Sequence, residues 1–263
     1  MKKTEETFKS ILNEIENALG NKSEISWFNL HYNRFLETLG ILVMEVPRGS
    51  LIIDIGCSPG YMTIAAKRLG YQVYGVNPEI DSLRKAIGDK DILIKKCDIE
   101  KEKIPFEDSS FDCVLFTEVI EHLNFYHVKF ALSEIKRVLK TKGILILSTP
   151  NLATLENRLF LLLGGCHYLG GGIINPAHNR EYTLSEVTGL LQEADFKIES
   201  HNYSIARDVI TYAEEDFISR EHVLKGFVRH KCWINTGRAL VYPLKMLFPF
   251  FRSTIFVLAR KID

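Results

Sequence analysis

The segment FTEVIEHLNFYH, residues 116–127, gathers side chains that can do chemistry. Glu118, Glu121 and His122 stand at positions i, i+3 and i+4 of the chain. In a helical turn this spacing would place two carboxylates and an imidazole on one face. An imidazole titrates near neutral pH and can act as a general base, while mixed carboxylate and imidazole ligands suit Mg²⁺, Mn²⁺ or Zn²⁺. A structural interpretation also stays open, in which Glu118 caps the turn and His122 is a satisfied polar residue.

A further histidine, His178, stands in the separate stretch PAHNREYTLSE, residues 176–186. In the metal interpretation, one divalent ion would be held by Glu118, Glu121, His122 and His178. In the metal-free interpretation, His122 is the base, Glu121 orients it, and His178 enters from an inserted segment.

A glycine-containing turn follows the strongly apolar run LIIDI, residues 51–55. Glycine allows a tight bend and lets a ligand approach bare backbone. The spacing is GxxxG rather than GxGxxG, and no GK[ST] follows, which argues against a dinucleotide-binding turn and against a P-loop. We expect this turn to bind a small molecule through Asp54, Gly56, Cys57, Ser58, Pro59 and Gly60.

Short apolar runs alternate with helical spacing from residue 50 onward. The expected strands are 51–55, 71–76, 91–97, 111–116, 143–149, 196–203 and 252–261, and the expected helices are 61–70, 80–87, 125–139 and 183–194. Continuous apolar strands that alternate with helices are typical of a parallel sheet covered on both faces. In such a sheet, the glycine turn and the segment with Glu118 follow strands and meet at one edge.

The turn DIGCSPG resembles the D/E-x-G-x-G-x-G signature of class I S-adenosylmethionine-dependent methyltransferases, with Ser58 where that family usually has glycine. The resemblance continues in order through residues 51–150. It implies an α/β fold with a Rossmann-like, seven-stranded, mostly parallel sheet, helices on both faces and a reversed last strand. It also implies S-adenosylmethionine as the cofactor, whose methyl group is transferred mainly through alignment of the reacting atoms.

Residues after the second and third expected strands match cofactor-binding positions of this family. Asn77, followed by Pro78, stands where the family normally has an acid that binds the ribose hydroxyls. An amide accepts a hydrogen bond without the charge, and a helix-capping role for Asn77 is an equal alternative. Asp98 and Ile99 match the acid that receives the adenine amino group and the apolar residue that packs on the ring. Glu118 is expected to contact the cofactor.

The E-x-x-E-H turn itself resembles two groups within the family. In small-RNA terminal 2′-O-methyltransferases, this turn and a later histidine hold a metal that orients vicinal hydroxyls, and HNREY (178–182) fits the later run. In ubiquinone-type O-methyltransferases the turn occurs without a metal, and the histidine is a candidate base.

The composition and the N-terminus of the chain indicate in which compartment the protein works. The 263 residues include 33 Lys and Arg and 33 Asp and Glu, and this neutral balance argues against a dominant nucleic-acid-binding surface. Five scattered cysteines without a CxxC pair predict reduced thiols, and the N-terminus lacks the apolar region of a signal peptide. We therefore expect a cytoplasmic protein, with peripheral membrane contact as an option.

The chain divides into an expected helical lid over residues 1–45 and a methyltransferase domain over 46–263. Insertions at 151–182 and 204–251 are where substrate specificity would reside, and glycines in the first predict a mobile loop. The apolar stretch 236–253 has basic flanks. We favour packing on the sheet or a dimer contact for it, with contact to lipid as the alternative.

We expect O-methylation of a small-molecule or lipid-linked acceptor. One alternative is metal-dependent 2′-O-methylation of an RNA 3′ end, against which the neutral charge weighs. Another is a non-catalytic binding protein with the same fold, against which the intact glycine turn weighs. The acceptor and the oligomeric state stay open.

Overall fold

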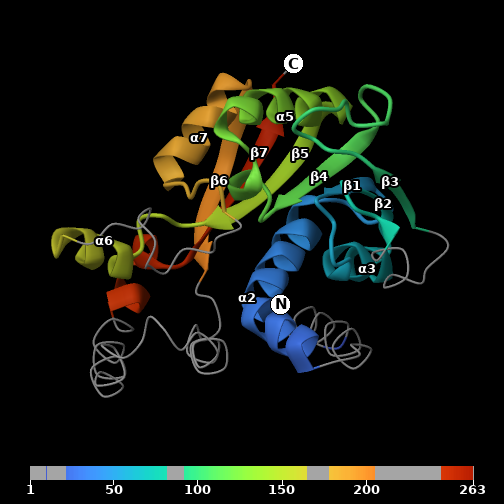
Figure 1. Ribbon diagram of the computed structural model, residues 1–263. Coiled ribbons are helices and arrows are strands. Elements are labelled where there is room, and N and C mark those ends of the chain that lie inside the picture. The colour runs from blue at the N-terminus through green and yellow to red at the C-terminus, as the bar shows by residue number, and fades with distance from the viewer. Residues whose placement is uncertain (1–9, 11–21, 82–91, 165–177, 205–243, 263) are drawn as a thin grey trace.

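The computed structural model describes residues 10, 22–81, 92–164, 178–204 and 244–262 (Figure 1). Most of the first 21 residues of the expected helical lid lie outside these residues. So do most of the helix expected at 80–87 and most of the glycines of the first insertion. Within the described helices, none is long and apolar enough to cross a membrane.

Seven strands form one sheet in the order β3-β2-β1-β4-β5-β7-β6. The strands are β1 (Leu51–Ile55), β2 (Gln72–Asn77), β3 (Leu93–Lys96), β4 (Phe111–Thr117), β5 (Leu139–Pro150), β6 (Phe196–Ser204) and β7 (Thr254–Lys261). Neighbouring strands from β3 to β5 are parallel, whereas β7 runs antiparallel to both β5 and β6. The expected seven-stranded sheet with a reversed last strand is confirmed.

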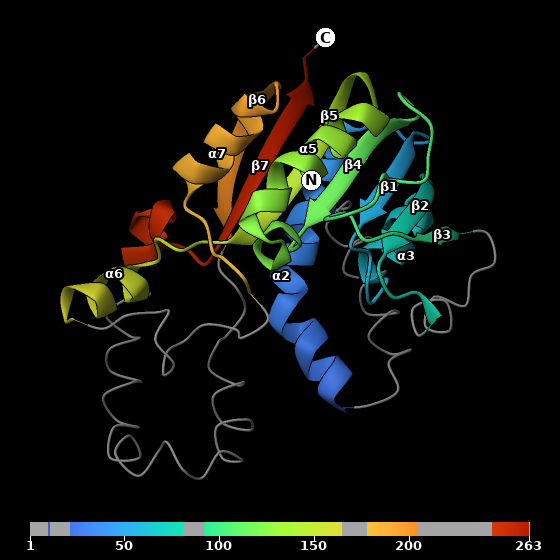
Figure 2. The same cartoon turned by 45° about the horizontal axis from the view of Figure 1, so that its top comes forward.

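Helices cover both faces of this sheet (Figures 1 and 2). One apolar core lies under α2 (Lys22–Glu45) and α3 (Tyr61–Arg68). The other lies under α5 (Phe125–Val138) and α7 (Leu184–Glu193). The short helix α6 (Leu155–Leu162) stands away from the sheet, near the 3-10 helix η3 (Pro249–Phe251). The Rossmann-like α/β class is therefore confirmed.

Local sequence explains the elements that frame the site. Ile52 and Ile53 point to opposite faces of β1 and are both fully buried, as in a strand covered on both sides. At the start of α7, the Thr183 hydroxyl accepts from the Glu186 amide while the Glu186 carboxylate accepts from the Thr183 amide. This is the capping box predicted from TLSE.

Strand β5 begins four residues earlier than expected. Leu139 pairs with Phe111, but the next pairing joins Ile144 to Cys113, so the register shifts between them. The chain turns through Lys142 at φ 60°, and a Cβ on Gly143 would lie 2.8 Å from the Lys140 carbonyl oxygen. The apolar run in the sequence marks only the part of β5 from Ile144 onward, which pairs continuously with β4. The turn at Lys142 separates this part from Leu139.

Candidate active site

The glycine turn lies at the carboxyl end of β1 and is fastened to both neighbouring strands. Gly56 and Gly60 have φ of 73° and 99°, a region that side chains rarely adopt. The Gly56 amide donates to the Val76 carbonyl over 2.9 Å. A Cβ added to Gly56 would lie 2.4 Å from Val119 Cγ2, so the turn contacts the segment after β4. The structure thus brings two of the sequence motifs together.

The side chain of Asp54, in β1 just before this turn, is buried and bonded to α3. Its carboxylate is 2% exposed and accepts from Thr63 Oγ1 of α3 over 2.6 Å. Burial raises the pKa of Asp54 to about 7, and the bond from Thr63 opposes part of that rise. Asp54 joins β1 to α3 and shapes the turn, which agrees with the position expected for it.

Three residues separate the two glycines of the turn. Cys57 is 4% exposed and packs against Gly75 and Ile94, and burial raises the pKa of its thiol well above the usual range. Ser58 is exposed and Pro59 half-buried. Any ligand contact through Cys57 would use its backbone, because its side chain faces the sheet.

Polar groups follow β2 and β3 at the same edge. Asn77 is 8% exposed, and its Nδ2 donates to the Glu79 carbonyl over 2.6 Å, so its amide holds the turn that begins at exposed Pro78. Its amide oxygen has no role in that bond. This contact differs from a helix N-cap, in which the side-chain oxygen accepts from a backbone amide, so the capping role and the ribose contact both stay predictions.

Asp98 and Ile99 follow β3. The Asp98 carboxylate accepts from the Glu100 amide over 3.1 Å and pairs with Lys101 at 2.7 Å. The bond from Lys101 lowers the pKa of Asp98, which stays ionised at neutral pH. Ile99 is buried in the larger core. Their roles toward adenine stay predictions.

Glu118 does not share a helical face with Glu121 and His122, so that expectation is wrong. The 3-10 helix η1 begins only at Ile120, and Glu118 precedes it in the left-handed region at φ 55°. Its carboxylate accepts from Ser148 Oγ over 2.9 Å and pairs with Arg34 of α2 at 2.7 Å. The positive φ turns Glu118 toward α2 and away from the histidines.

Glu121, His122 and His178 do gather, and each offers a ligand atom within 4.8 Å of the others. Glu121 is fully buried: its Oε2 accepts from Thr149 Oγ1 over 3.0 Å, while its Oε1 has no hydrogen-bond partner among the described residues. Burial, and then the charge of Glu118, raise the pKa of Glu121 well above its usual value. An orphaned carboxylate oxygen beside two imidazoles suits a bound proton or a cation.

The distances within this cluster refine the expected roles. His122 Nε2 lies 4.0 Å from Glu121 Oε1, which is longer than a hydrogen bond. The rings of His122 and His178 stand edge to face with centroids 4.9 Å apart, and His178 Nδ1 lies 3.4 Å from Glu181 Oε1. Three of the four residues expected to hold a metal lie together in the structure. The fourth, Glu118, is paired with Arg34 instead.

Backbone bonds hold His178 in place, although 178–182 is remote in sequence from η1. The amides of Asn179 and Arg180 donate to the Glu121 carbonyl over 2.8 and 3.1 Å. The Asn179 side chain donates to the His122 carbonyl. The inserted segment therefore forms one wall of the site, as expected for His178.

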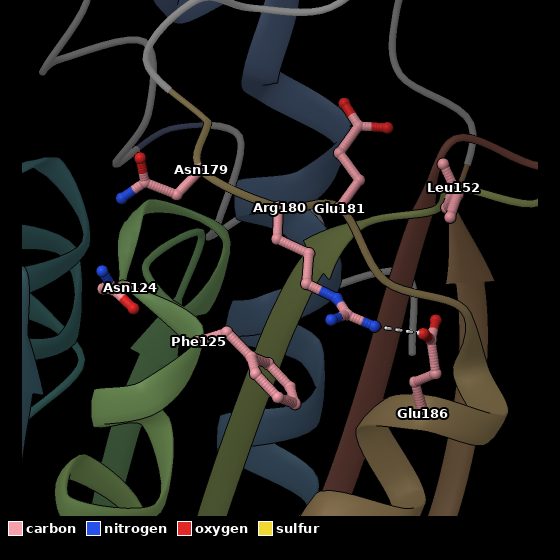
Figure 3. A pocket seen from close by; sticks show the side chains of 7 residues that line it. All are labelled: Asn124, Phe125, Leu152, Asn179, Arg180, Glu181 and Glu186. Atoms are coloured by element: carbon pink, nitrogen blue, oxygen red, sulfur yellow. Dashed lines mark hydrogen bonds and ion pairs between the residues drawn. The ribbon is translucent and has the colours of Figure 1, made fainter. Parts of the chain in front are cut away.

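A pocket of about 470 Å³ opens beside this cluster (Figure 3). Its lining is mostly polar: Asn124, Asn179, Arg180, Glu181 and Glu186, with Phe125 and Leu152 as the apolar members. The Arg180 guanidinium lies 4.4 Å from the centre of the Phe125 ring and 2.6 Å from Glu186 Oε1.

Sequence reasoning missed both arginines of the site, Arg34 and Arg180. Arg34 lies in α2, within the expected helical lid, and no sequence motif marks it. The HNREY run was used only for its histidine, although its arginine stood in the same motif.

Comparisons with known proteins agree with the fold and with the methyltransferase family. Residues 53–147 match the family model described as a methyltransferase domain. The chain is 32% identical over 145 residues to the mitochondrial ubiquinone biosynthesis O-methyltransferase of Mus musculus, covering 52% of this chain and 38% of that protein. It is also 32% identical over 127 residues to the ubiquinone biosynthesis O-methyltransferase of Pelagibacter ubique, covering 45% and 49%. The chain thus spans about half or less of the length of these relatives.

The fold also matches solved structures. One is 1,6-didemethyltoxoflavin-N1-methyltransferase from Burkholderia thailandensis, solved with 1,6-didemethyltoxoflavin and S-adenosylhomocysteine bound. The TM-score is 0.56 and the sequence identity 16%, with 92% of this chain and 83% of that chain covered. At this identity the likeness establishes the fold alone.

Proposed function

We propose that this chain, whose residues 53–147 form a class I S-adenosylmethionine-dependent methyltransferase domain, transfers a methyl group to an oxygen of a small or lipid-linked acceptor. The observation that carries the proposal is the meeting of Glu121, His122 and His178 beside the glycine turn. A base cluster next to a ligand-binding turn is the arrangement that an alcohol acceptor needs, since its proton must leave.

The edge of the sheet fits S-adenosylmethionine by its chemistry. Hydrogen-bond acceptors follow three strands in turn: Asn77 after β2, Asp98 after β3 and Glu118 after β4. Hydroxyls and amino groups of an adenosyl ligand are donors that such a row would receive. When bound, S-adenosylmethionine supplies a methyl group on a positively charged sulfur. The chain would contribute the bare backbone of Gly56 and Gly60 and the carboxylate of Glu118.

His122 is the proposed base. The His122 side chain is 41% exposed, so an acceptor can reach it, whereas the side chain of Glu121 is completely buried. The acceptor hydroxyl would lose its proton to His122 as its oxygen attacks the methyl carbon. Glu121, when ionised, would favour the protonated imidazole, and the His178 ring would pack against the ring of His122. The mitochondrial and bacterial ubiquinone O-methyltransferases named above support oxygen as the acceptor atom.

Binding of S-adenosylhomocysteine by isothermal titration tests the cofactor part of the proposal. Gly56→Ala should weaken binding at least about ten-fold, because its Cβ would overlap Val119 and its φ is positive. Gly189→Ala is the matched control, since Gly189 lies in α7 with nothing within 4 Å of an added Cβ. Absence of binding by the wild type would contradict the proposal and favour a non-catalytic role.

A second candidate is metal-assisted methylation of a vicinal diol, such as a catechol or an RNA 3′ end. The buried, unpartnered Oε1 of Glu121 beside His122 and His178 favours it among the described residues. These three side chains would hold the ion, which would lower the pKa of the attacked hydroxyl. Elemental mass spectrometry on protein purified without a metal column decides between the two. Stoichiometric metal in the wild type that is lost in His122→Ala would favour this candidate, and no metal after soaking in Mn²⁺ or Zn²⁺ would remove it.

We also propose a cytoplasmic location. Cys57, Cys97 and Cys113 are buried free thiols, as is usual in a reducing compartment. Fractionation of the native cells would test it: recovery in the soluble cytoplasm or peripherally on a membrane facing it would support the proposal, and recovery outside the cell or in another compartment would contradict it.

A further inference from the structure

Exposed apolar side chains concentrate on two segments next to each other. Of the fifteen large hydrophobic residues that are exposed in the described part of the chain, nine lie at 159–163 or 244–250. We call this the apolar surface: Leu159, Leu161, Leu162, Leu163, Leu244, Met246, Leu247, Phe248 and Phe250. Leu162 and Leu163 are 81% and 85% exposed. Of the stretch 236–253, residues 236–243 lie outside the described residues. Within 244–250 the large apolar side chains are exposed, although η3 contacts β6 of the sheet.

The two segments are tied together although they are far apart in sequence. Asn151, just before α6, donates through Nδ2 to the carbonyls of Phe250 and Arg252 over 3.0 and 2.8 Å. Its amide donates to the Ser253 carbonyl over 2.8 Å. Both views place α6 beside η3 (Figures 1 and 2). The two segments that carry the apolar surface are therefore joined at their base through Asn151.

The lining of the pocket and the start of α6 are close together in the chain. Leu152 lines the pocket, and its amide donates to the Tyr182 carbonyl over 2.9 Å. Three residues later the chain enters α6. Leu152 therefore links the lining of the mostly polar pocket to the start of α6, which carries part of the apolar surface (Figure 3).

Charges of both signs lie near the apolar surface: α6 carries Glu156 and Arg158, and the Glu37 carboxylate is within electrostatic reach of Arg252, whereas the second segment itself is basic. Residues 244–253 include Lys245 and Arg252 and no carboxylate. Arg252 donates to the carbonyls of Lys245 and Tyr203, which holds its guanidinium at the base of the segment. Leucine and phenylalanine with flanking cations are the composition of segments that lie in a membrane interface.

We propose that the apolar surface docks on a membrane containing anionic lipids, with Leu161, Leu162, Leu163, Met246 and Leu247 entering the interface. Docking would place the pocket at the membrane and give it access to an acceptor carried there. This inference goes beyond the proposed reaction and does not depend on it, because the surface lies outside the base cluster and the glycine turn.

Vesicle co-sedimentation of the full chain tests the proposal. The wild type should bind vesicles of phosphatidylcholine and phosphatidylglycerol in equal parts more tightly than vesicles of phosphatidylcholine alone. Leu162→Glu with Leu163→Glu should reduce the partition coefficient roughly ten-fold or more, since each leucine no longer leaves water. Both side chains are exposed, so the variant should fold as the wild type does. Met44→Glu is the matched control, because Met44 is 82% exposed on α2 and should leave binding unchanged.

Several outcomes would overturn the proposal. One is that the wild type binds neither kind of vesicle. Another is that Met44→Glu reduces vesicle binding as much as the leucine variant does. A third is a wild-type dimer in light scattering that the leucine variant converts to a monomer. The last would assign the surface to a second copy of the chain. His122→Ala should bind vesicles normally, and unchanged binding of S-adenosylhomocysteine by the leucine variant would separate docking from the proposed reaction.

Discussion

Arg34 Nη1 lies 2.7 Å from Glu118 Oε2, which joins the middle of α2 to the loop after β4. Both side chains are largely buried, at 12% and 16% exposure, and Ser148 donates to the other oxygen of Glu118. Glu118 sits at φ 55° in a backbone conformation that a glutamate rarely adopts. The ion pair therefore orients a carboxylate at the carboxyl edge of the sheet through a helix outside the sheet.

Removing this contact should weaken both the fold and the site. Arg34→Gln leaves Glu118 largely buried without its counter-ion, and we expect a loss of about 1–3 kcal/mol in the free energy of unfolding. Affinity for S-adenosylhomocysteine should fall with it. Urea denaturation and titration calorimetry measure the two effects, and Arg34→Lys should recover part of each.

A control variant and a double-mutant cycle test whether the effect of Arg34→Gln comes from its pairing with Glu118. The exposed pair Lys129–Glu193 has a similar distance of 2.9 Å, so Lys129→Gln should change stability by less than about 0.5 kcal/mol. A double-mutant cycle of Arg34→Gln with Glu118→Gln should give a clear coupling energy. Additive effects would show that the pair contributes nothing.

The pKa of Asp54 predicts a pH dependence of stability. Its folded value is about 7, whereas an aspartate in an unfolded chain titrates near about 3.9. Between these values the folded state binds more protons, so stability falls as the pH rises, and the loss is complete above pH 7. Glu121, whose pKa is also raised, acts in the same direction.

Asp54→Asn isolates the Asp54 part of this dependence. The amide can still accept from Thr63 but does not titrate. Between about pH 5 and pH 7.5, the wild type should lose roughly 2 kcal/mol more unfolding free energy than the variant. Equal slopes for both proteins in urea titrations at the two pH values would refute a raised pKa at Asp54.

Loss of the proposed base should affect turnover and leave the cofactor bound. With a catechol-type acceptor, we expect His122→Asn to reduce methyl transfer roughly 10²–10⁴-fold, with unchanged affinity for S-adenosylhomocysteine. The control is His127→Asn, since His127 lies on α5 and pairs with Glu100 at 3.6 Å. A His122 variant with wild-type turnover would leave the base unassigned.

Arg180 should act on the acceptor. Its guanidinium reaches the pocket between Phe125 and Glu186, so Arg180→Ala removes a charged donor from the lining (Figure 3). We expect KM for the acceptor to rise about ten-fold with unchanged cofactor affinity. Arg260→Ala is the control, because Arg260 bonds to the Lys142 carbonyl away from the pocket. A fall in cofactor affinity instead would indicate that Arg180 supports the fold of the site.

The order of strands and helices followed from the sequence because its signals are local. Burial on both faces makes β1 a continuous apolar run, and the Thr183–Glu186 box marks the start of α7 within four residues. The glycine turn was likewise recognisable, since Gly56 and Gly60 stand where the backbone needs positive φ. The parallel sheet then required these motifs to meet at one edge.

Only the tertiary structure decided which side chains at that edge contact one another. Spacing placed Glu118 with Glu121 and His122, but its positive φ turns it to Arg34 of a distant helix. Arg180 reaches Phe125 through the bonds that hold its segment to Glu121. Asn151, just before α6, holds the distant 244–252 segment through the carbonyls of Phe250 and Arg252. Periodicity reports the burial of a residue within its own element, whereas these contacts depend on how separate elements pack.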